Sequence, residues 1–171
     1  MTAYIPLTEN TFAVVDLEDV PKIFDVSLNW WKNNRGYAVS KHKVNSTGYS
    51  RFYHMHRLVA DTPASLQTDH ANRDRLDNRK DNLRAVTNSQ NQANKIKVRP
   101  WGKRPSRFKG LSSRGKGWRI YCKGKYLGYE INEALAALTY NAEAYAIWGA
   151  HSLLNELVFD GSTRILLDAY S

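Results

Sequence analysis

The order of apolar and polar residues divides the first third of the chain into short strands and one brief helix. Residues 12–15 are apolar and partly β-branched, which predicts a strand, and residues 18–25 predict a helix with acids in its first turn. Residues 30–31 and 37–39 flank the turn-like segment 33–36 and predict a β-hairpin. Because aromatic side chains are mostly packing residues, we expect both hairpin tryptophans in the core.

The middle of the chain surrounds a long polar segment with apolar ones. Residues 49–55 alternate aromatic and polar side chains, which predicts a strand, and residues 56–60 predict one or two helical turns before Pro63. A short strand is expected to end in the Asp-His pair at 69–70, and residues 71–82 form a polar loop.

Beyond this loop the pattern predicts one more strand and a helix, followed by a linker. The strand covers residues 83–86, and Thr87 is a candidate N-cap for a helix from residue 88 to about 95. Residues 99–106 are basic, contain two prolines and show no periodicity, so we expect a linker that lies along a phosphate backbone.

The C-terminal third predicts a three-stranded sheet with one helix. The three strands are expected at residues 107–112, 117–123 and 125–129, separated by glycine-containing turns. Residues 131–148 predict a helix whose apolar face is formed by Leu135, Leu138, Ala142, Tyr145, Ile147 and Trp148. The tail at 153–171 has two apolar clusters that would cap this domain or meet a partner.

The charge distribution points to a polyanionic partner. The chain of 171 residues carries a formal net charge of +9, and no Asp or Glu occurs from Asn82 to Tyr129. Cys122 is the only cysteine, which excludes a disulfide framework and zinc fingers with two or four cysteines. With no apolar run near 18 residues and no leader-like N-terminus, we expect a soluble, intracellular protein without membrane contact.

The Asp-His pair and the later asparagines suit hydrolysis of a phosphodiester. That reaction needs a base for water and a cation on the scissile phosphate. Asp69 is a hard oxygen ligand suited to Mg²⁺, an Asn oxygen is a neutral second ligand, and His70 is the natural base. Adjacent strand residues point to opposite faces, so Asp69 and His70 share one centre only if the strand bends or ends there.

The segments HMHRLVA and TDHANRDRLDNRKDNLRAVTNSQNQAN, in this order, closely resemble HNH endonucleases of the homing type found in phages and introns. The resemblance covers about residues 10–98 and implies a ββα-metal fold in which two strands and a helix close a one-metal site. It implies that Asp69 and Asn91 bind Mg²⁺, with Mn²⁺ as a possible substitute, and that His70 is the general base. It also implies that Asn82 holds the loop and that His56 supports the site.

One departure from this family concerns the loop after the Asp-His pair. The family often has His-Ile-Asn-Gly-Asp there, whereas this chain has His70-Ala71-Asn72-Arg73-Asp74. The missing glycine affects the turn of the loop and leaves the ligands in place.

The segment from Ser106 to Gly149 resembles the ethylene-response-factor type of DNA-binding domain, which has a three-stranded sheet and a helix behind it. Strand alternation places Trp118, Ile120 and Cys122 toward the helix. The expected DNA-binding residues are Lys109, Arg114, Arg119, Tyr121, Lys123, Lys125 and Tyr126. Ser112, Tyr129 and Glu130 depart from the plant pattern, so no base preference carries over.

Together these observations predict an α+β protein with an HNH nuclease domain at residues 1–98 (catalytic core about 49–96), the linker, and a DNA-binding domain at 107–152. The expected function is metal-dependent cleavage of double-stranded DNA without a small-molecule cofactor, by a phage-encoded protein acting in a bacterial host. One catalytic set per chain implies at least a nick, and a double-strand break would need a homodimer, two sequential nicks or rotation. The alternatives are a catalytically silent DNA-binding regulator and a basic RNA- or ribosome-binding protein.

Overall fold

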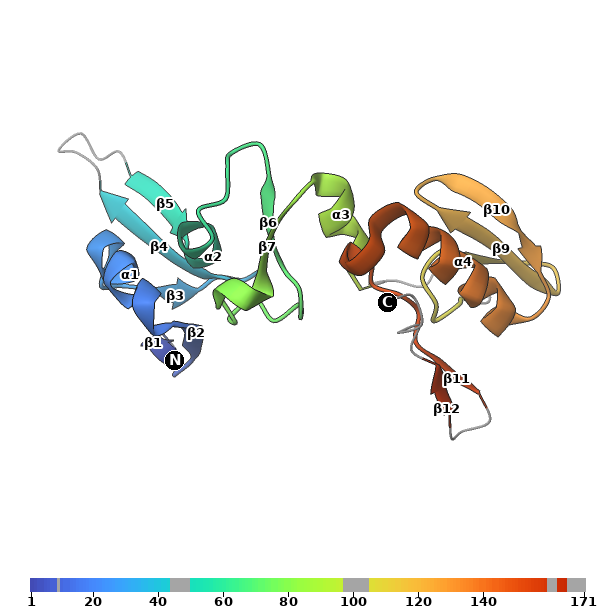
Figure 1. Ribbon diagram of the computed structural model, residues 1–171, viewed down its shortest axis with the longest axis horizontal. Coiled ribbons are helices and arrows are strands. Elements are labelled where there is room, and N and C mark those ends of the chain that lie inside the picture. The colour runs from blue at the N-terminus through green and yellow to red at the C-terminus, as the bar shows by residue number, and fades with distance from the viewer. Residues whose placement is uncertain (9, 44–49, 97–104, 160–162, 166–171) are drawn as a thin grey trace. The chain divides into compact units, whose positions relative to one another are not determined.

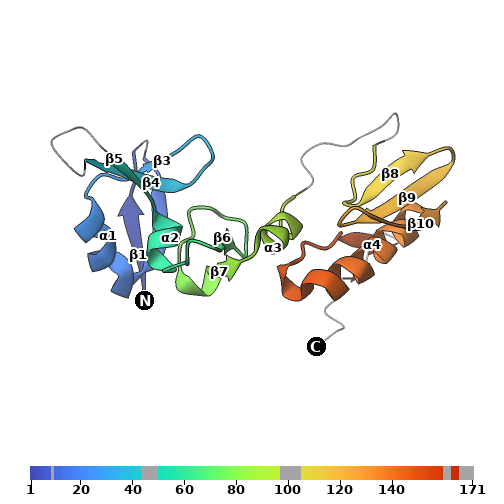
Figure 2. The same cartoon turned by 90° about the horizontal axis from the view of Figure 1, so that it is seen from above.

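A computed structural model describes residues 1–8, 10–43, 50–96, 105–159 and 163–165 of the chain. It is a mixed α/β structure with several small sheets, and it divides into two compact units, Met1–Asn91 and Gln92–Ser171 (Figures 1 and 2). Residues 99–104 of the predicted linker lie outside the described residues. No helix in the described ranges is long and apolar enough to cross a membrane.

The first unit begins with two strands and a helix. Strands β1 (Thr2–Pro6) and β2 (Phe12–Asp16) pair antiparallel, and a 3₁₀ turn (Leu17–Asp19) leads into helix α1 (Val20–Val26). The predicted strand at 12–15 is confirmed, and the predicted helix at 18–25 is found as this turn and α1. The pattern had not indicated β1.

A three-stranded antiparallel sheet follows, in the order β3 (Trp31–Lys32), β4 (Ala38–Lys43) and β5 (Ser50–His54). The predicted hairpin and the predicted strand at 49–55 are therefore confirmed. Gly36 has φ +83° in the turn of the hairpin, a conformation that favours glycine.

Helix α2 (Met55–Val59) continues directly from β5, and a second hairpin pairs β6 (Gln67–His70) with β7 (Leu83–Val86). Helix α3 (Asn88–Ala93) comes next. Thr87 caps it reciprocally with Gln90: Thr87 Oγ1 accepts from the Gln90 N–H at 3.3 Å, and Gln90 Oε1 accepts from the Thr87 N–H at 2.9 Å. The sequence of strand, loop, strand and helix is thus confirmed.

The core of the first unit joins its N-terminal strands to the elements around the second hairpin. Side chains from β1, β2, α1, β4 and α2, with two from the adjoining segments, form one buried cluster: Ile5, Leu7, Ala13, Val15, Ile23, Trp30, Ala38, Met55 and Val59. Leu76 and Leu83, in and after the polar loop, pack against it. The first 30 residues are therefore part of the body that carries the Asp-His pair.

The second unit is a three-stranded antiparallel sheet with one long helix. Its strands are β8 (Leu111–Arg114), β9 (Gly117–Cys122) and β10 (Lys125–Glu130), and the helix is α4 (Glu133–Trp148). Asn132 caps α4 by accepting from the N–H groups of Ala134 and Leu135. A short hairpin of β11 (Leu157–Phe159) and β12 (Thr163–Ile165) comes after it.

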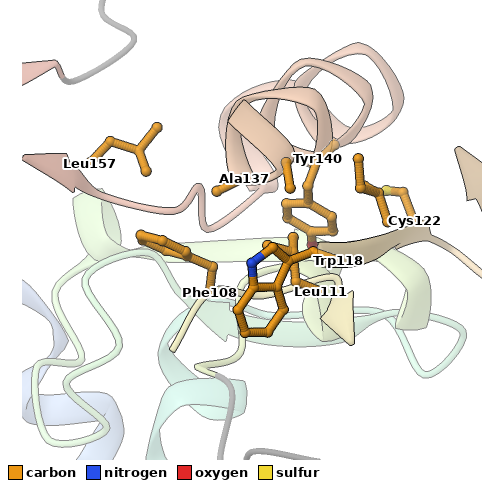
Figure 3. Close-up of a cluster of buried hydrophobic side chains, with 10 residues drawn as sticks. Phe108, Leu111, Trp118, Cys122, Ala137, Tyr140 and Leu157 are labelled. Carbon is orange, nitrogen blue, oxygen red and sulfur yellow. The ribbon is translucent and has the colours of Figure 1, made fainter. Parts of the chain in front are cut away.

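The core of the second unit lies between this sheet and α4 (Figure 3). Trp118, Ile120 and Cys122 are buried there, as strand alternation predicts. The expected face of the helix is confirmed only in part: Leu138 and Trp148 pack against this core, whereas Leu135 is 49% exposed and Ile147 38% exposed. The buried face is made of small residues and one aromatic: Ala136, Ala137, Tyr140, Asn141 and Ala144.

The first part of the tail belongs to this unit, because Leu157 is buried in the core. Asn155 Oδ1 accepts from the Lys109 N–H at 2.6 Å, and the Asn155 backbone exchanges two hydrogen bonds with the amide of Asn141. These bonds hold the segment before β8, so the strand begins at Leu111 and not at residue 107 as predicted.

Gly110 gives a direct test of this packing. It has φ +81°, and a Cβ there would lie 2.0 Å from Tyr140 Cδ2. Gly110→Ala is expected to lower the free energy of unfolding of the second unit by about 3 kcal/mol, from overpacking and backbone strain together. Gly124→Ala is the control: φ is +80° but nothing lies within 4 Å, so about 1 kcal/mol is expected. Equal losses in chemical denaturation would contradict this account.

Candidate functional site

The β6–β7 hairpin positions the Asp-His pair. Asp69 lies opposite Arg84 and His70 opposite Leu83, so pairing of the strands continues through the last residue of β6. Both side chains of the pair are buried, at 8% and 4% exposure. Adjacent strand residues point to opposite faces, and accordingly Asp69 contacts Arg84 whereas His70 contacts Asn78. β6 ends at His70, the last residue of the pair.

The face of the hairpin that carries Asp69 also contacts helix α3. Arg84 Nη2 donates to Asp69 Oδ2 at 2.6 Å. Gln67, two residues before Asp69 and therefore on the same strand face, accepts a hydrogen bond at Oε1 from Asn91 Nδ2. The structure thus brings Asn91, from α3, to the face that carries Asp69.

His70 lies in a cluster of aromatic rings. Its ring centroid is 5.2 Å from that of His56 and 6.0 Å from that of Tyr37, and His54 lies 5.4 Å from His56. His70 Nε2 is 3.2 Å from Asn78 Oδ1. The Asn78 amide nitrogen donates to the carbonyl of Leu76, which fixes the amide oxygen toward His70.

Burial lowers the pKa of each member of this histidine cluster (His54, His56 and His70), which favours the neutral imidazole. It lowers the pKa of His70, and the hydrogen bond with Asn78 and the charge of Asp69 partly oppose that effect. Burial lowers the pKa of His56 to about 3, with further contributions from His70 and His54. The resemblance implied support by His56, and the structure places its ring directly against His70.

Asn82 ties the two ends of the 71–82 loop together. Its Oδ1 accepts from the Asn72 N–H at 2.9 Å, its Nδ2 donates to the Asp77 carbonyl at 2.7 Å, and its own carbonyl accepts from the Ala71 N–H at 2.8 Å. Asp77 is held in turn by Arg79, whose hydrogen bonds lower the pKa of that carboxyl. Asn82 therefore orders the loop through backbone groups on both sides.

Arg73 occupies the position where the family often has glycine. Its φ is +67°, and its N–H donates to the His70 carbonyl at 2.9 Å. The left-handed turn is thus made without glycine, at a conformational cost on the order of 1 kcal/mol for a side chain with a Cβ.

The loop is also held from outside by β2. The Val14 N–H donates to the Leu76 carbonyl at 2.8 Å, and the Asn78 N–H donates to the Val14 carbonyl at 2.7 Å. Asp16 Oδ2 accepts from the Lys80 N–H at 2.9 Å. Asn78, the residue against His70, is therefore fixed by its backbone as well as by its amide.

Sequence reasoning missed Asn78. It lies in the LDNR segment eight residues after His70, among several polar residues of similar composition. No periodicity distinguishes it, and only the contacts of the folded loop do.

The donor groups fit a hard divalent cation. Asp69 offers a carboxylate and Asn91 an amide oxygen on the same side of the hairpin, which are ligand types that Mg²⁺ and Mn²⁺ accept. Within the described ranges no group of three or more His, Cys, Asp or Glu side chains that could hold a metal ion is found. A cation here would share the Asp69 carboxylate with Arg84.

The outer face of the second sheet carries most of the residues expected to bind DNA. Arg119 and Tyr121 point away from the core on β9, and Tyr126 pairs with Tyr121 at a ring distance of 5.4 Å. Arg114, in β8, and Lys123, in the turn with φ +49°, are exposed.

Lys109 and Lys125 lie elsewhere. The Lys109 ammonium donates to the carbonyls of Ala93 and Lys95, and its partial burial lowers its pKa. Lys125 pairs across the sheet with Cys122, on the helix side, and forms an ion pair with Glu143 at 3.1 Å. The alternation of side chains along β9 does not predict the positions of Lys109 and Lys125. Lys109 lies before the start of β8, and the turn between β9 and β10 places Lys125 on the inner face of the sheet.

Tyr129 joins the outer face, although the sequence pattern did not mark it as a binding residue. A β-bulge between Tyr126 and Gly128, where Gly128 has φ +148°, turns Tyr129 to the same face as Tyr126. A Cβ at Gly117 would lie 2.6 Å from the Tyr129 ring, so that glycine makes room for it. The result is a groove of about 380 Å³ lined by Arg114, Gly115, Arg119, Tyr126 and Tyr129.

Comparison with known proteins supports part of the expected family. Residues 53–93 match the HNH endonuclease family. Over 163 residues the chain is 26% identical to an uncharacterized HNH endonuclease of Acanthamoeba polyphaga mimivirus, covering 88% of this chain and 78% of the relative. No solved structure matches. These similarities indicate a nuclease, a class that generally uses divalent metal ions, and they give no support to the ethylene-response-factor resemblance.

The low pKa of His56 predicts a loss of stability in acid. Its pKa falls from 6.5 in the unfolded chain to about 3 in the folded chain, so the unfolded chain binds the extra proton between these values. The contribution of His56 to the free energy of unfolding is therefore fully present above about pH 6.5 and is lost toward pH 3, by about 5 kcal/mol. His56→Phe should flatten this dependence in denaturant unfolding measured across pH, whereas His42→Asn, at an exposed strand position, should not. An unchanged slope in His56→Phe would refute the assignment.

Proposed function

We propose that this protein is a metal-dependent DNA endonuclease of the HNH homing type, with a ββα-metal site. The observation that carries the proposal is the arrangement around β6: Asp69 with Asn91 on one side, and a neutral His70 oriented by Asn78. The match of residues 53–93 to HNH endonucleases supports the same assignment.

Asp69 and Asn91 would hold the cation in this proposal. When bound, Mg²⁺, or Mn²⁺ in its place, supplies positive charge to the scissile phosphate and the leaving oxygen. Arg84 keeps the Asp69 carboxylate in a fixed orientation through its 2.6 Å ion pair.

His70 is proposed as the general base. It takes a proton from the attacking water as the water oxygen bonds to phosphorus and the bond from phosphorus to the leaving sugar oxygen breaks. Its lowered pKa keeps the imidazole unprotonated and ready to accept. Asn78 Oδ1, 3.2 Å from Nε2, accepts a hydrogen bond from the imidazolium that results.

We assign double-stranded DNA binding to the second unit. Its outer face offers guanidinium groups for phosphates and exposed tyrosine rings for sugars and bases, and Arg119 and Tyr129 line its groove of about 380 Å³. Ethylene-response-factor-type binding by a sheet face remains part of this proposal.

A second candidate function is a catalytically silent DNA-binding regulator. The observation that favours it is the ion pair of Asp69 with Arg84, which already neutralises the proposed ligand. Metal titration by calorimetry separates the two functions. If the protein is a nuclease, wild type binds Mg²⁺ and Asp69→Ala does not. If it is a silent regulator, wild type and Asp69→Ala give the same titration.

Loss of the base or of the ligand should abolish cleavage. With supercoiled plasmid and Mg²⁺, we expect His70→Ala and Asp69→Ala to lower the rate of nicking by about 100-fold or more. His42→Ala, at an exposed strand position in the same unit, is the matched control and should cleave like wild type. Equal cleavage by wild type and His70→Ala would overturn the catalytic assignment.

Substitutions on the two faces of the second sheet should affect DNA binding differently. Arg119→Ala is expected to weaken binding about tenfold, from the loss of one guanidinium contact. Lys125→Gln should change affinity less than about twofold, because that ammonium is engaged with Glu143. Fluorescence anisotropy on a labelled duplex at fixed salt measures both, and the reverse order of effects would exclude the outer face.

A further inference from the structure

The sheet of the first unit has one face that lies outside the main buried cluster of that unit, although Val39 on this face is itself buried. Register places Trp31, Lys41, Phe52 and His54 on this side, and we call these four residues the aromatic-basic face. The opposite side of the same strands packs into the core through Ala38 and Tyr53. Phe52 is 59% exposed.

The members of this face contact one another. The Lys41 Nζ lies 5.5 Å from the centre of the Phe52 ring, and Trp31 meets Phe52 edge to face at 6.5 Å. Of the two tryptophans expected in the core, Trp30 is buried at 2% exposure, whereas Trp31 is only partly buried. A cation beside exposed aromatic rings is a pattern typical of nucleic-acid contact surfaces.

The charge around this face is of one sign. Between Asp25 and Asp61 the chain has no acidic residue. Its charged side chains there are Lys32, Arg35, Lys41, Lys43, Arg51 and Arg57. Of these, register places Lys41 on the aromatic-basic face. A phosphodiester strand at this sheet would therefore meet Lys41 directly, with only cationic charged residues in the surrounding segment.

The aromatic-basic face shares His54 with the histidine cluster. His54, at its end, is 5.4 Å from His56, which is 5.2 Å from His70. Tyr37 lies beside His54 and His70, and the Arg75 guanidinium covers its ring at 4.8 Å. Phe52 and His54 lie two residues apart on the same face of β5, and ring contacts lead from His54 to the proposed base within one unit.

We propose that the aromatic-basic face is a second DNA-binding surface, which holds the strand that enters the active site. Lys41 contacts a phosphate, and the rings of Phe52 and Trp31 contact the neighbouring sugar or base. The identity of the polyanion as DNA rests on the proposed function. The charge and the aromatic rings favour a nucleic acid over an acidic protein, which offers no planar groups at regular spacing.

The test uses the full chain and matched pairs of variants. Lys41→Gln and Phe52→Ala alter the face, and Lys22→Gln and Phe24→Ala remove the same residue types from α1, where Lys22 pairs with Asp61 and Phe24 is 37% exposed. Binding of a mixed-sequence DNA duplex is measured by anisotropy over a range of KCl, with thermal unfolding to confirm that each variant is folded.

We expect Lys41→Gln to reduce the slope of log affinity against log salt by about one, and Phe52→Ala to weaken binding about fivefold or more. The two α1 variants should stay within about twofold of wild type. Single-turnover cleavage at saturating DNA should keep its rate in Lys41→Gln, while the DNA concentration for half-maximal rate rises.

The outcomes separate this inference from the nuclease proposal. One outcome is that Lys41→Gln reduces the slope of log affinity against log salt while wild type cleaves no DNA. That outcome supports the aromatic-basic face as a DNA-binding surface and contradicts the nuclease proposal. If wild type cleaves and both face variants bind like the α1 variants, the surface is refuted and the nuclease proposal stands. An RNA duplex of equal length that competes better than DNA would also overturn the assignment to DNA.

Discussion

The site depends on two backbone hydrogen bonds between distant parts of the chain, those of Val14 with Leu76 and Asn78. A polar loop of this length has many backbone groups that need partners, and an isolated loop would find them in water. By pairing with β2, the loop gains a fixed backbone at the point where the Asn78 amide meets His70. The N-terminal strands therefore act on the chemistry although they contribute no catalytic side chain.

The sequence was sufficient where a local pattern decides the structure. The alternation in β9, the apolar and β-branched segment of β2 and the Thr87 cap each depend on neighbours in the chain, and each was predicted. The Asp69-His70 pair was found from chemistry and resemblance. The folded chain adds that these two residues contact different neighbours, because strand pairing continues through His70.

The features that could not be predicted depend on contacts between distant residues. Asn78 gains its role from Val14 and Leu76, and the buried face of α4 is set by close packing of alanines on the sheet, not by its largest apolar residues. Tyr129 reaches the outer face only because a bulge changes the alternation after Tyr126. Arg73 adopts a conformation for which glycine would be the usual choice.

Helix α3 has a consequence for how such proteins can be recombined. The division between the two units falls within it, after Asn91. The Ala93 carbonyl at its C-terminal end already belongs to the second unit and accepts from the Lys109 ammonium of that unit. A chimera that joins the first unit to a different recognition module cannot be divided after Asn91, because that cut removes the end of α3 that follows this proposed metal ligand. The transferable segment has to extend past Ala93, and its new partner has to supply a cation for the exposed helix end.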